Sequence, residues 1–143
     1  MDKSKELTAT VTLVNEKLNF TGTVDGNAPV SIDYMPPLGD NLGYTSLELL
    51  LLSLSSCLGS SALTFLRRMG KTITMFAIRS KGIRRQEHPT GFSQIIMEMD
   101  IQSNNLTEAE VDKVVQLSEA TFCPVWSMIR GNVTVEVKYN ITW

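Results

Sequence analysis

The stretch TSLELLLLSLSSCLGSSALTFLRR, residues Thr45 to Arg68, is the least polar run in the chain, and it decides the fold. Its leucines fall on all sides of a helix instead of along one stripe, so we expect a helix that is buried on most sides. Thr45 and Glu48 have the spacing of a capping box at the start of this helix. Arg67, Arg68 and Gly70 have the composition of a helix end.

The uncharged part of this run, residues 49–66, is also long enough to span a membrane. Five serines and Thr64 interrupt it, and the chain around it has the pattern of strands, so we expect a core helix and no membrane partner. Cys57 lies near its middle. From this helix alone, Cys57 is best interpreted as a small buried hydrophobic residue.

Length and composition indicate one globular domain over residues 1–143, because 43% of the 143 residues are hydrophobic and 20% are charged. The formal net charge of −2 and the absence of a long basic run argue against nucleic-acid binding. The first ten residues lack the apolar core of a secretory signal, so we expect a cytoplasmic protein.

The chain has two cysteines, Cys57 and Cys123, and one histidine, His88. This set is too small for a zinc site with the usual ligands, and Cys–His catalysis would require His88 to lie near a thiol. We expect no metal and no cofactor. In a reducing compartment the two thiols are either structural or a transient redox pair.

Alternating apolar residues predict three antiparallel strands with one buried face, over residues 7–14, 18–24 and 30–34. The next segment, residues 35–43, is rich in proline and glycine and is expected to be a loop that either lines a pocket or covers the core. After the long helix, residues 72–85 and 94–102 alternate as two further strands. Their basic and acidic outer faces are expected to pair.

A second capping box at Thr107 begins an amphipathic helix that is predicted to end near Ala120. Pro124 suits the first position of a short helix, which makes Cys123 its N-cap. Residues 133–143 alternate as the last strand. The order βββ-α-ββ-αα-β predicts an α+β fold of about six antiparallel strands around a long central helix, and two chains that enclose their helices together would form a homodimer.

These features resemble the OsmC/Ohr family. The resemblance rests on SLELLLLSLSSC, which runs into Cys57, on the second thiol in Cys123-Pro124-Val125, and on the strand order over nearly the whole chain. It implies an OsmC-like fold and an intertwined homodimer with two active sites at the interface. It also implies that Cys57 is the peroxidatic thiol, which attacks an organic hydroperoxide, and that Cys123 is the resolving thiol. A dithiol reductant, typically a lipoyl group, would then reduce the disulfide.

The peroxidases of this family hold the thiolate with an early-strand arginine and a glutamate ten residues before the cysteine. Here Leu47 stands ten residues before Cys57 and Glu48 nine before, so Glu48 is the candidate for that role. No arginine precedes Arg67, and Lys17, Arg67, Arg68 and Arg130 are the substitute cations. Cys123, at a helix N-terminus, is expected to be stabilised as thiolate.

We expect Tyr44, Leu54 and Trp126 to line the substrate pocket. Two hypotheses follow. In the first, the protein is a thiol-dependent peroxidase that reduces organic hydroperoxides in oxidative-stress defence. In the second, the same fold is a catalytically weak or inactive binding or redox-sensing module with a small hydrophobic ligand in an apolar pocket at the dimer interface.

Overall fold

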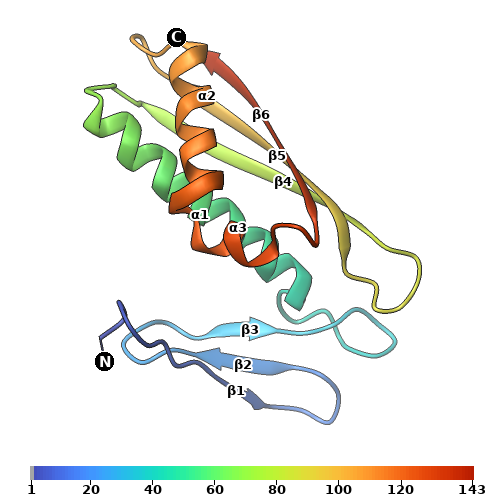
Figure 1. Ribbon diagram of the computed structural model, residues 1–143. Coiled ribbons are helices and arrows are strands. Elements are labelled where there is room, and N and C mark those ends of the chain that lie inside the picture. The colour runs from blue at the N-terminus through green and yellow to red at the C-terminus, as the bar shows by residue number, and fades with distance from the viewer. Residues whose placement is uncertain (1) are drawn as a thin grey trace. The chain divides into compact units, whose positions relative to one another are not determined.

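A computed structural model describes residues 2–143 and divides them into two compact units, one that ends at Leu49 and one that comprises Leu50–Trp143. The first unit contains β1 (Thr10–Leu13), β2 (Phe20–Thr23) and β3 (Val30–Ile32), drawn in blue in Figure 1. The three strands form an antiparallel meander in the order β1-β2-β3. The predicted meander is therefore confirmed, and a single domain over residues 1–143 stays a prediction.

Several apolar side chains of this first sheet are exposed and none of those in its strands is fully buried, which contradicts the expectation of one buried face. Val11, Leu13 and Val30 are 59%, 51% and 38% exposed. A single three-stranded sheet cannot bury its own apolar face. Another layer of structure must pack against that face to exclude water from it. The alternating pattern thus identified the strands correctly, but it carried no information about what covers them.

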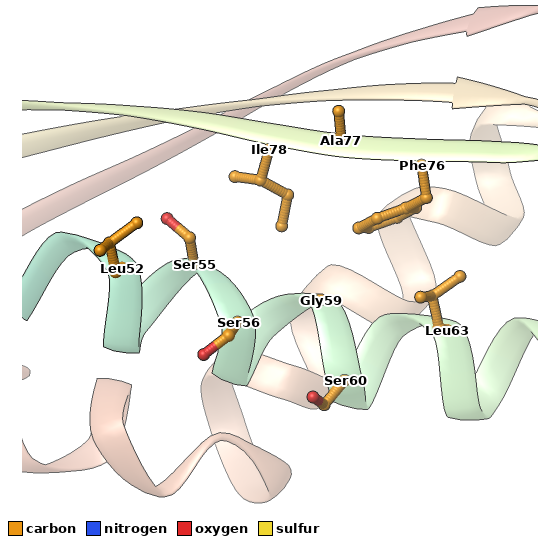
Figure 2. A pocket seen from close by; sticks show the side chains of 9 residues that line it. All are labelled: Leu52, Ser55, Ser56, Gly59, Ser60, Leu63, Phe76, Ala77 and Ile78. Atoms are coloured by element: carbon orange, nitrogen blue, oxygen red, sulfur yellow. The ribbon is translucent and has the colours of Figure 1, made fainter. Parts of the chain in front are cut away.

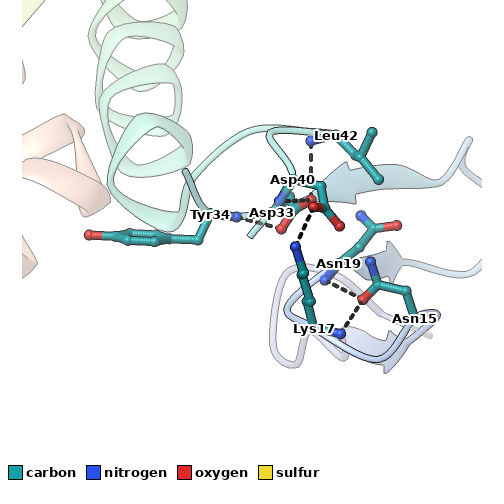
Figure 3. Close-up of polar contacts among 7 residues, drawn as sticks. All are labelled: Asn15, Lys17, Asn19, Asp33, Tyr34, Asp40 and Leu42. Atoms are coloured by element: carbon teal, nitrogen blue, oxygen red, sulfur yellow. Dashed lines mark hydrogen bonds and ion pairs between the residues drawn. The ribbon is translucent and has the colours of Figure 1, made fainter. Parts of the chain in front are cut away.

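A buried carboxylate organises the loop that leads from β3 toward the long helix (Figure 3). Asp33 is 3% exposed and accepts hydrogen bonds from the backbone N–H groups of Tyr34, Asp40 and Leu42 at 2.7, 3.3 and 3.1 Å. Burial on its own raises the pKa of Asp33, but these three N–H groups and the nearby charge of Lys17 hold it below its usual value. The proline- and glycine-rich loop is therefore held by defined contacts.

The long helix α1 (Ser46–Arg68) begins and ends as the sequence predicts. The Thr45 backbone N–H donates to Glu48 Oε1 at 2.8 Å, and the Glu48 N–H donates to Thr45 Oγ1 at 3.2 Å, which completes the capping box. At the other end Gly70 has φ +78°, and the N–H groups of Gly70 and Lys71 donate to the carbonyls of Arg67 and Leu66. This pair of bonds is the Schellman motif.

Only one stripe of α1 is fully buried, so the prediction of a helix buried on most sides is wrong for the single chain. The stripe repeats every four residues and consists of Leu54, Leu58, Ala62 and Leu66, with Gly59 beside it. Leu52, on another side of the helix, is 53% exposed. By length and composition, α1 is the one helix within residues 2–143 that could also cross a membrane, a test that core helices pass as well.

The second sheet contains β4 (Met75–Arg84), β5 (Phe92–Gln102) and β6 (Thr134–Thr142), with β5 in the middle. β4 pairs with β5 antiparallel, and the predicted contact between their outer faces is present as an ion pair of 3.7 Å between Arg79 and Glu98. β5 pairs with β6 in parallel, which corrects the expectation of antiparallel strands throughout. The three helical segments between β5 and β6 supply the long crossover that a parallel pair requires.

Helices cover one face of the second sheet, as Figure 1 shows. Gly59 of α1 lies against Phe76 and Ile78 of β4, where an added Cβ would come within 3.4 and 3.6 Å of their side chains. By the register of the three strands, Tyr139 of β6 lies on the same face of the sheet as Ile78. Its hydroxyl donates to Asp112 of α2 (Glu108–Leu117) at 2.7 Å. The core of this unit therefore lies between β5 and the two helices.

The predicted second helix does not continue to Ala120 as an α-helix. α2 ends at Leu117, and a π-helical turn, η1 (Ser118–Phe122), follows it. The Cys123 N–H closes this turn by donating to the Ser118 carbonyl at 2.9 Å. Cys123 is then the N-cap of α3 (Pro124–Ile129), with Pro124 in the first turn, as predicted.

Candidate active site

The fold of the second unit brings the two cysteines together. Cys57, in the middle of α1, and Cys123, between η1 and α3, are both free thiols, and Cys57 lies near enough to affect the pKa of Cys123 through the two side chains. They differ in exposure, because Cys57 is half-buried and Cys123 is 1% exposed. The pair therefore has one thiol that solvent reaches and one that is sealed in the core.

The electrostatics of Cys123 differ from the expectation for a thiol at a helix N-terminus. Burial is the main cause that raises the pKa of Cys123 to about 11, and the neighbouring Cys57 side chain adds to the rise. The backbone N–H groups of Trp126 and Val125 act in the opposite direction. The prediction of a stabilised thiolate at Cys123 is wrong because loss of solvation outweighs the N–H groups, and Cys123 keeps its proton at neutral pH.

Cys57 opens into a pocket of about 460 Å³ on the side of α1 that faces η1 and α3. Hydroxyl groups, two aromatic rings and a guanidinium line it, from Ser60, Ser61, Thr64, Phe65, Arg68, Phe122 and Pro124. The rings of Phe65 and Phe122 meet edge to face with their centroids 4.8 Å apart. This pocket offers the accessible thiol both an apolar wall and polar groups.

Sequence reasoning identified the two thiols but not most of the pocket. The expected pocket residues were Tyr44, Leu54 and Trp126, while Ser61 and Phe122 had no assigned role. The spacing of Ser61 and Phe65, four and eight residues after Cys57, places them near its side of the helix. No comparable signal marks Phe122, because its position depends on the π-helical turn.

The other predicted site residues lie elsewhere. Leu54 is fully buried and Trp126 is 3% exposed, so both are core side chains of the second unit and do not line the Cys57 pocket. Tyr44 and Glu48 line a different pocket, of about 640 Å³, in the first unit. The hydrogen bonds from Thr45 lower the pKa of Glu48. A role for Glu48 at the thiol stays a prediction.

The substitute cations have different surroundings. Lys17 forms an ion pair of 2.8 Å with Asp40, and both side chains are partly exposed (Figure 3). Arg130 follows α3 as its C-cap and is exposed, as is Arg67. Arg68 alone among these cations lines the pocket that contains Cys57. Among residues 2–143, no three His, Cys, Asp or Glu side chains gather as they would around a metal ion.

A second hollow, of about 390 Å³, lies between α1 and β4 and contains no thiol (Figure 2). Phe76 and Ile78 point from β4 toward the helix, where Gly59 leaves room for them. The Ser55 hydroxyl donates to the Ser80 hydroxyl at 3.0 Å and ties the same two elements together. Neither of the two thiols therefore lines this hollow.

The fold and the site together define an α+β protein with two neighbouring thiols, of which Cys123 is buried and Cys57 is open to a pocket. The family described as OsmC-like protein matches residues 39–138, which is more than half of the chain. The chain therefore belongs to the OsmC-like family, as its resemblance predicted. A search of curated protein sequences gives no match.

Solved structures confirm the fold at low sequence identity. A hypothetical protein from Aquifex aeolicus is 22% identical with a TM-score of 0.85, and covers 97% of this chain and 98% of its own. An OsmC-like protein from Mycoplasma pneumoniae is also 22% identical, with a TM-score of 0.84 and full coverage of both chains. The organic hydroperoxide resistance protein OhrB of Bacillus subtilis is 21% identical, with a TM-score of 0.64 over 93% of this chain and 98% of its own.

Proposed function

We propose that the protein is a thiol-dependent peroxidase that reduces organic hydroperoxides with Cys57 and Cys123. The observation that carries the proposal is the proximity of two thiols of unequal exposure. A peroxide that enters the pocket meets Cys57 first, while Cys123 is buried beside it. This is the arrangement that a peroxidatic and a resolving thiol require.

The chemistry balances with these two residues and an external dithiol. The Cys57 thiolate attacks one oxygen of the hydroperoxide, the O–O bond breaks, and the other oxygen leaves as an alcohol after it takes up a proton. Cys57 is then a sulfenic acid. The Cys123 sulfur displaces its hydroxyl group as water and forms a disulfide, and a dithiol of the lipoyl type returns two electrons and two protons.

The distribution of protons supports these roles. Cys123 is protonated at neutral pH because its pKa is raised, so it is a poor first nucleophile. It reacts only after the sulfenic acid has formed at Cys57. The proximity of the two sulfurs then raises the rate of attack, although only a small fraction of Cys123 is thiolate. No arginine precedes Arg67, so the early-strand arginine of the family's peroxidases has no counterpart here, and this absence counts against the proposal.

The test is the addition of one equivalent of cumene hydroperoxide to the reduced protein, followed by intact mass and thiol titration. We expect the wild type to lose two thiols and two hydrogens in mass. Cys123→Ser should gain one oxygen that dimedone traps, whereas Cys57→Ser should keep its mass and its remaining thiol. Cys57→Ser also controls for methionine oxidation. An unchanged wild-type mass after minutes would reject the proposal.

We also propose that the protein acts as a homodimer. Its support is the exposed apolar surface on both units, which includes Val11 and Val30 of the first sheet and Leu52 of α1. Sedimentation equilibrium of the full chain tests this. A monomer at micromolar concentration would contradict it.

A second function is favoured by one observation in the first unit. A pocket of about 610 Å³ there is lined mainly by apolar groups, among them Val11, Val24, Val30 and Ile32, and contains no thiol. Its size suits a small hydrophobic ligand, so the protein would be a binding module. A ligand that co-purifies in native mass spectra, together with thiols that do not react with hydroperoxide, would favour this function over the peroxidase.

A further inference from the structure

The Cys57 pocket extends along one side of α1 toward the end of the helix. In a helix with 100° per residue, Thr64 lies about 20° short of two full turns after Cys57, and Arg68 about 20° beyond three. The three residues therefore form one row, and all of them line the pocket. The rings of Phe65 and Phe122 stand beside this row as an apolar wall.

Arg68 has no structural partner that accounts for its place in the pocket. Within residues 2–143, the ion pairs join Lys17 to Asp40, Lys71 to Glu110, and Arg79 to Glu98, so none of them involves Arg68. A cation in the last turn of a helix is favoured by the helix dipole, but Arg67 already supplies one there and does not line the pocket. Arg68 thus presents an unneutralised positive charge to the pocket.

The distance to Cys57 excludes one role for that charge. Eleven residues of helix separate the two Cα atoms by about 16 Å along the axis. Even if Arg68 extends back toward Cys57, the direction that long helical side chains favour, a gap on the order of 10 Å is expected, comparable to the Debye length in 0.1 M salt. At that range Arg68 does little to stabilise a thiolate, while it suits the far end of a ligand whose reacting group lies at Cys57.

We propose that Arg68 is a specificity-determining residue that binds a carboxylate at the end of the substrate chain. The guanidinium matches a carboxylate with two parallel hydrogen bonds, which a neutral chain end does not form. The apolar middle of a chain of medium length lies against Phe65 and Phe122. The placement of a hydroperoxide group at Cys57 rests on the proposed peroxidase function. The binding of a carboxylate at Arg68 does not depend on that function.

The kinetic test compares a carboxylated alkyl hydroperoxide of medium chain length with its methyl ester. We expect Arg68→Ala to raise KM for the acid about fivefold, as expected for an exposed charge pair, with kcat and the ester unchanged. Arg68→Lys should restore part of the loss. Arg67→Ala, the matched control on the same turn, should alter neither substrate. Equal effects of Arg67→Ala and Arg68→Ala would overturn the proposal, since they would indicate a general surface charge.

An alkylation experiment that needs no peroxide separates carboxylate binding at Arg68 from the proposed peroxidase function. The iodoacetyl derivative of aminooctanoic acid and its methyl ester alkylate thiols with loss of iodide, and peptide mass spectrometry follows the rate at Cys57. We expect the acid to react faster than the ester in wild type, and this preference to disappear in Arg68→Ala but not in Arg67→Ala. Equal rates for acid and ester in wild type would overturn the role of Arg68. If the wild type reduces no hydroperoxide, the peroxidase proposal fails, and the alkylation experiment alone decides whether Arg68 binds a carboxylate.

Discussion

The hydroxyl of Ser61 on α1 is hydrogen-bonded to the hydroxyl of Ser118, the first residue of the π-helical turn η1. Ser118 is fully buried and also donates to the Val114 carbonyl at 2.8 Å. Because Ser61 lies one turn after Cys57 and the Cys123 N–H bonds to the Ser118 carbonyl, this contact fixes the two thiol-bearing segments to each other. Geometry at the thiols is therefore set by a polar contact one turn away.

The first prediction concerns this contact. We expect Ser118→Ala to lower the free energy of unfolding by about 1 kcal/mol, because the buried hydroxyl loses its bonds with Ser61 and Val114. It should also slow disulfide formation between Cys57 and Cys123. Urea unfolding and thiol titration during oxidation measure the two effects. Ser56→Ala, which removes an exposed hydroxyl of the same helix, is the control and should change neither.

The second prediction uses the raised pKa of Cys123. In the folded protein, alkylation of Cys123 by iodoacetamide should be negligible at neutral pH and should rise toward a midpoint near pH 11, while Cys57 is the thiol modified first. Peptide mapping of the wild type separates the two sites. Modification of Cys123 at pH 7 as fast as that of Cys57 would contradict the burial of its sulfur.

The same shift has a consequence for stability. A thiol whose pKa is higher in the folded protein, about 11 against 9.0, binds its proton more tightly when folded. Its contribution to stability is therefore complete below pH 9.0 and is lost as the pH rises from 9.0 to about 11. In Cys123→Ser this part of the alkaline destabilisation should be absent.

The third prediction separates the structural role of Glu48 from a catalytic one. Thr45→Ala and Glu48→Ala each remove half of the capping box and should cost about 1 kcal/mol of stability. If capping is the whole role of Glu48, both variants should leave the alkylation rate of Cys57 unchanged. A loss of Cys57 reactivity in Glu48→Ala that Thr45→Ala does not reproduce would assign the carboxylate to the thiol.

The fourth prediction concerns a close backbone approach in the first unit. A Cβ at Gly43 would lie 2.1 Å from the carbonyl oxygen of Ser31, so the backbone must move to accept it. We expect Gly43→Ala to destabilise the protein by more than about 2 kcal/mol, as measured by chemical denaturation. Gly91→Ala is the control, because a Cβ there meets no atom within 4 Å.

Local sequence signals predicted the elements well wherever neighbouring residues decide the structure. The capping box of Thr45 and Glu48, the left-handed Gly70 and the position of Pro124 each depend on a few consecutive residues. The alternating strands were equally clear, since side-chain period is a local property. Signals of this range, however, do not state which strand pairs with which, and the parallel β5–β6 pair was therefore missed.

The site was predictable only in part for the same reason. The sequence offered Cys57 and Cys123 as thiols, and the family resemblance assigned their roles, but their proximity depends on the packing of α1 against η1. The expected thiolate at Cys123 was wrong because a helix N-terminus is a local feature, whereas desolvation depends on every element that surrounds the sulfur.

By itself, the sequence determined the type and order of the elements, the ends of α1 and the identity of the two thiols, because hydrophobic period, capping and turn chemistry act over a few residues. Only the tertiary structure decided which thiol is sealed, which one opens to a pocket, and that Arg68 shares this pocket. Burial and contact are properties of segments far apart in the chain, and the π-helical turn that places Phe122 and Cys123 forms where those segments pack.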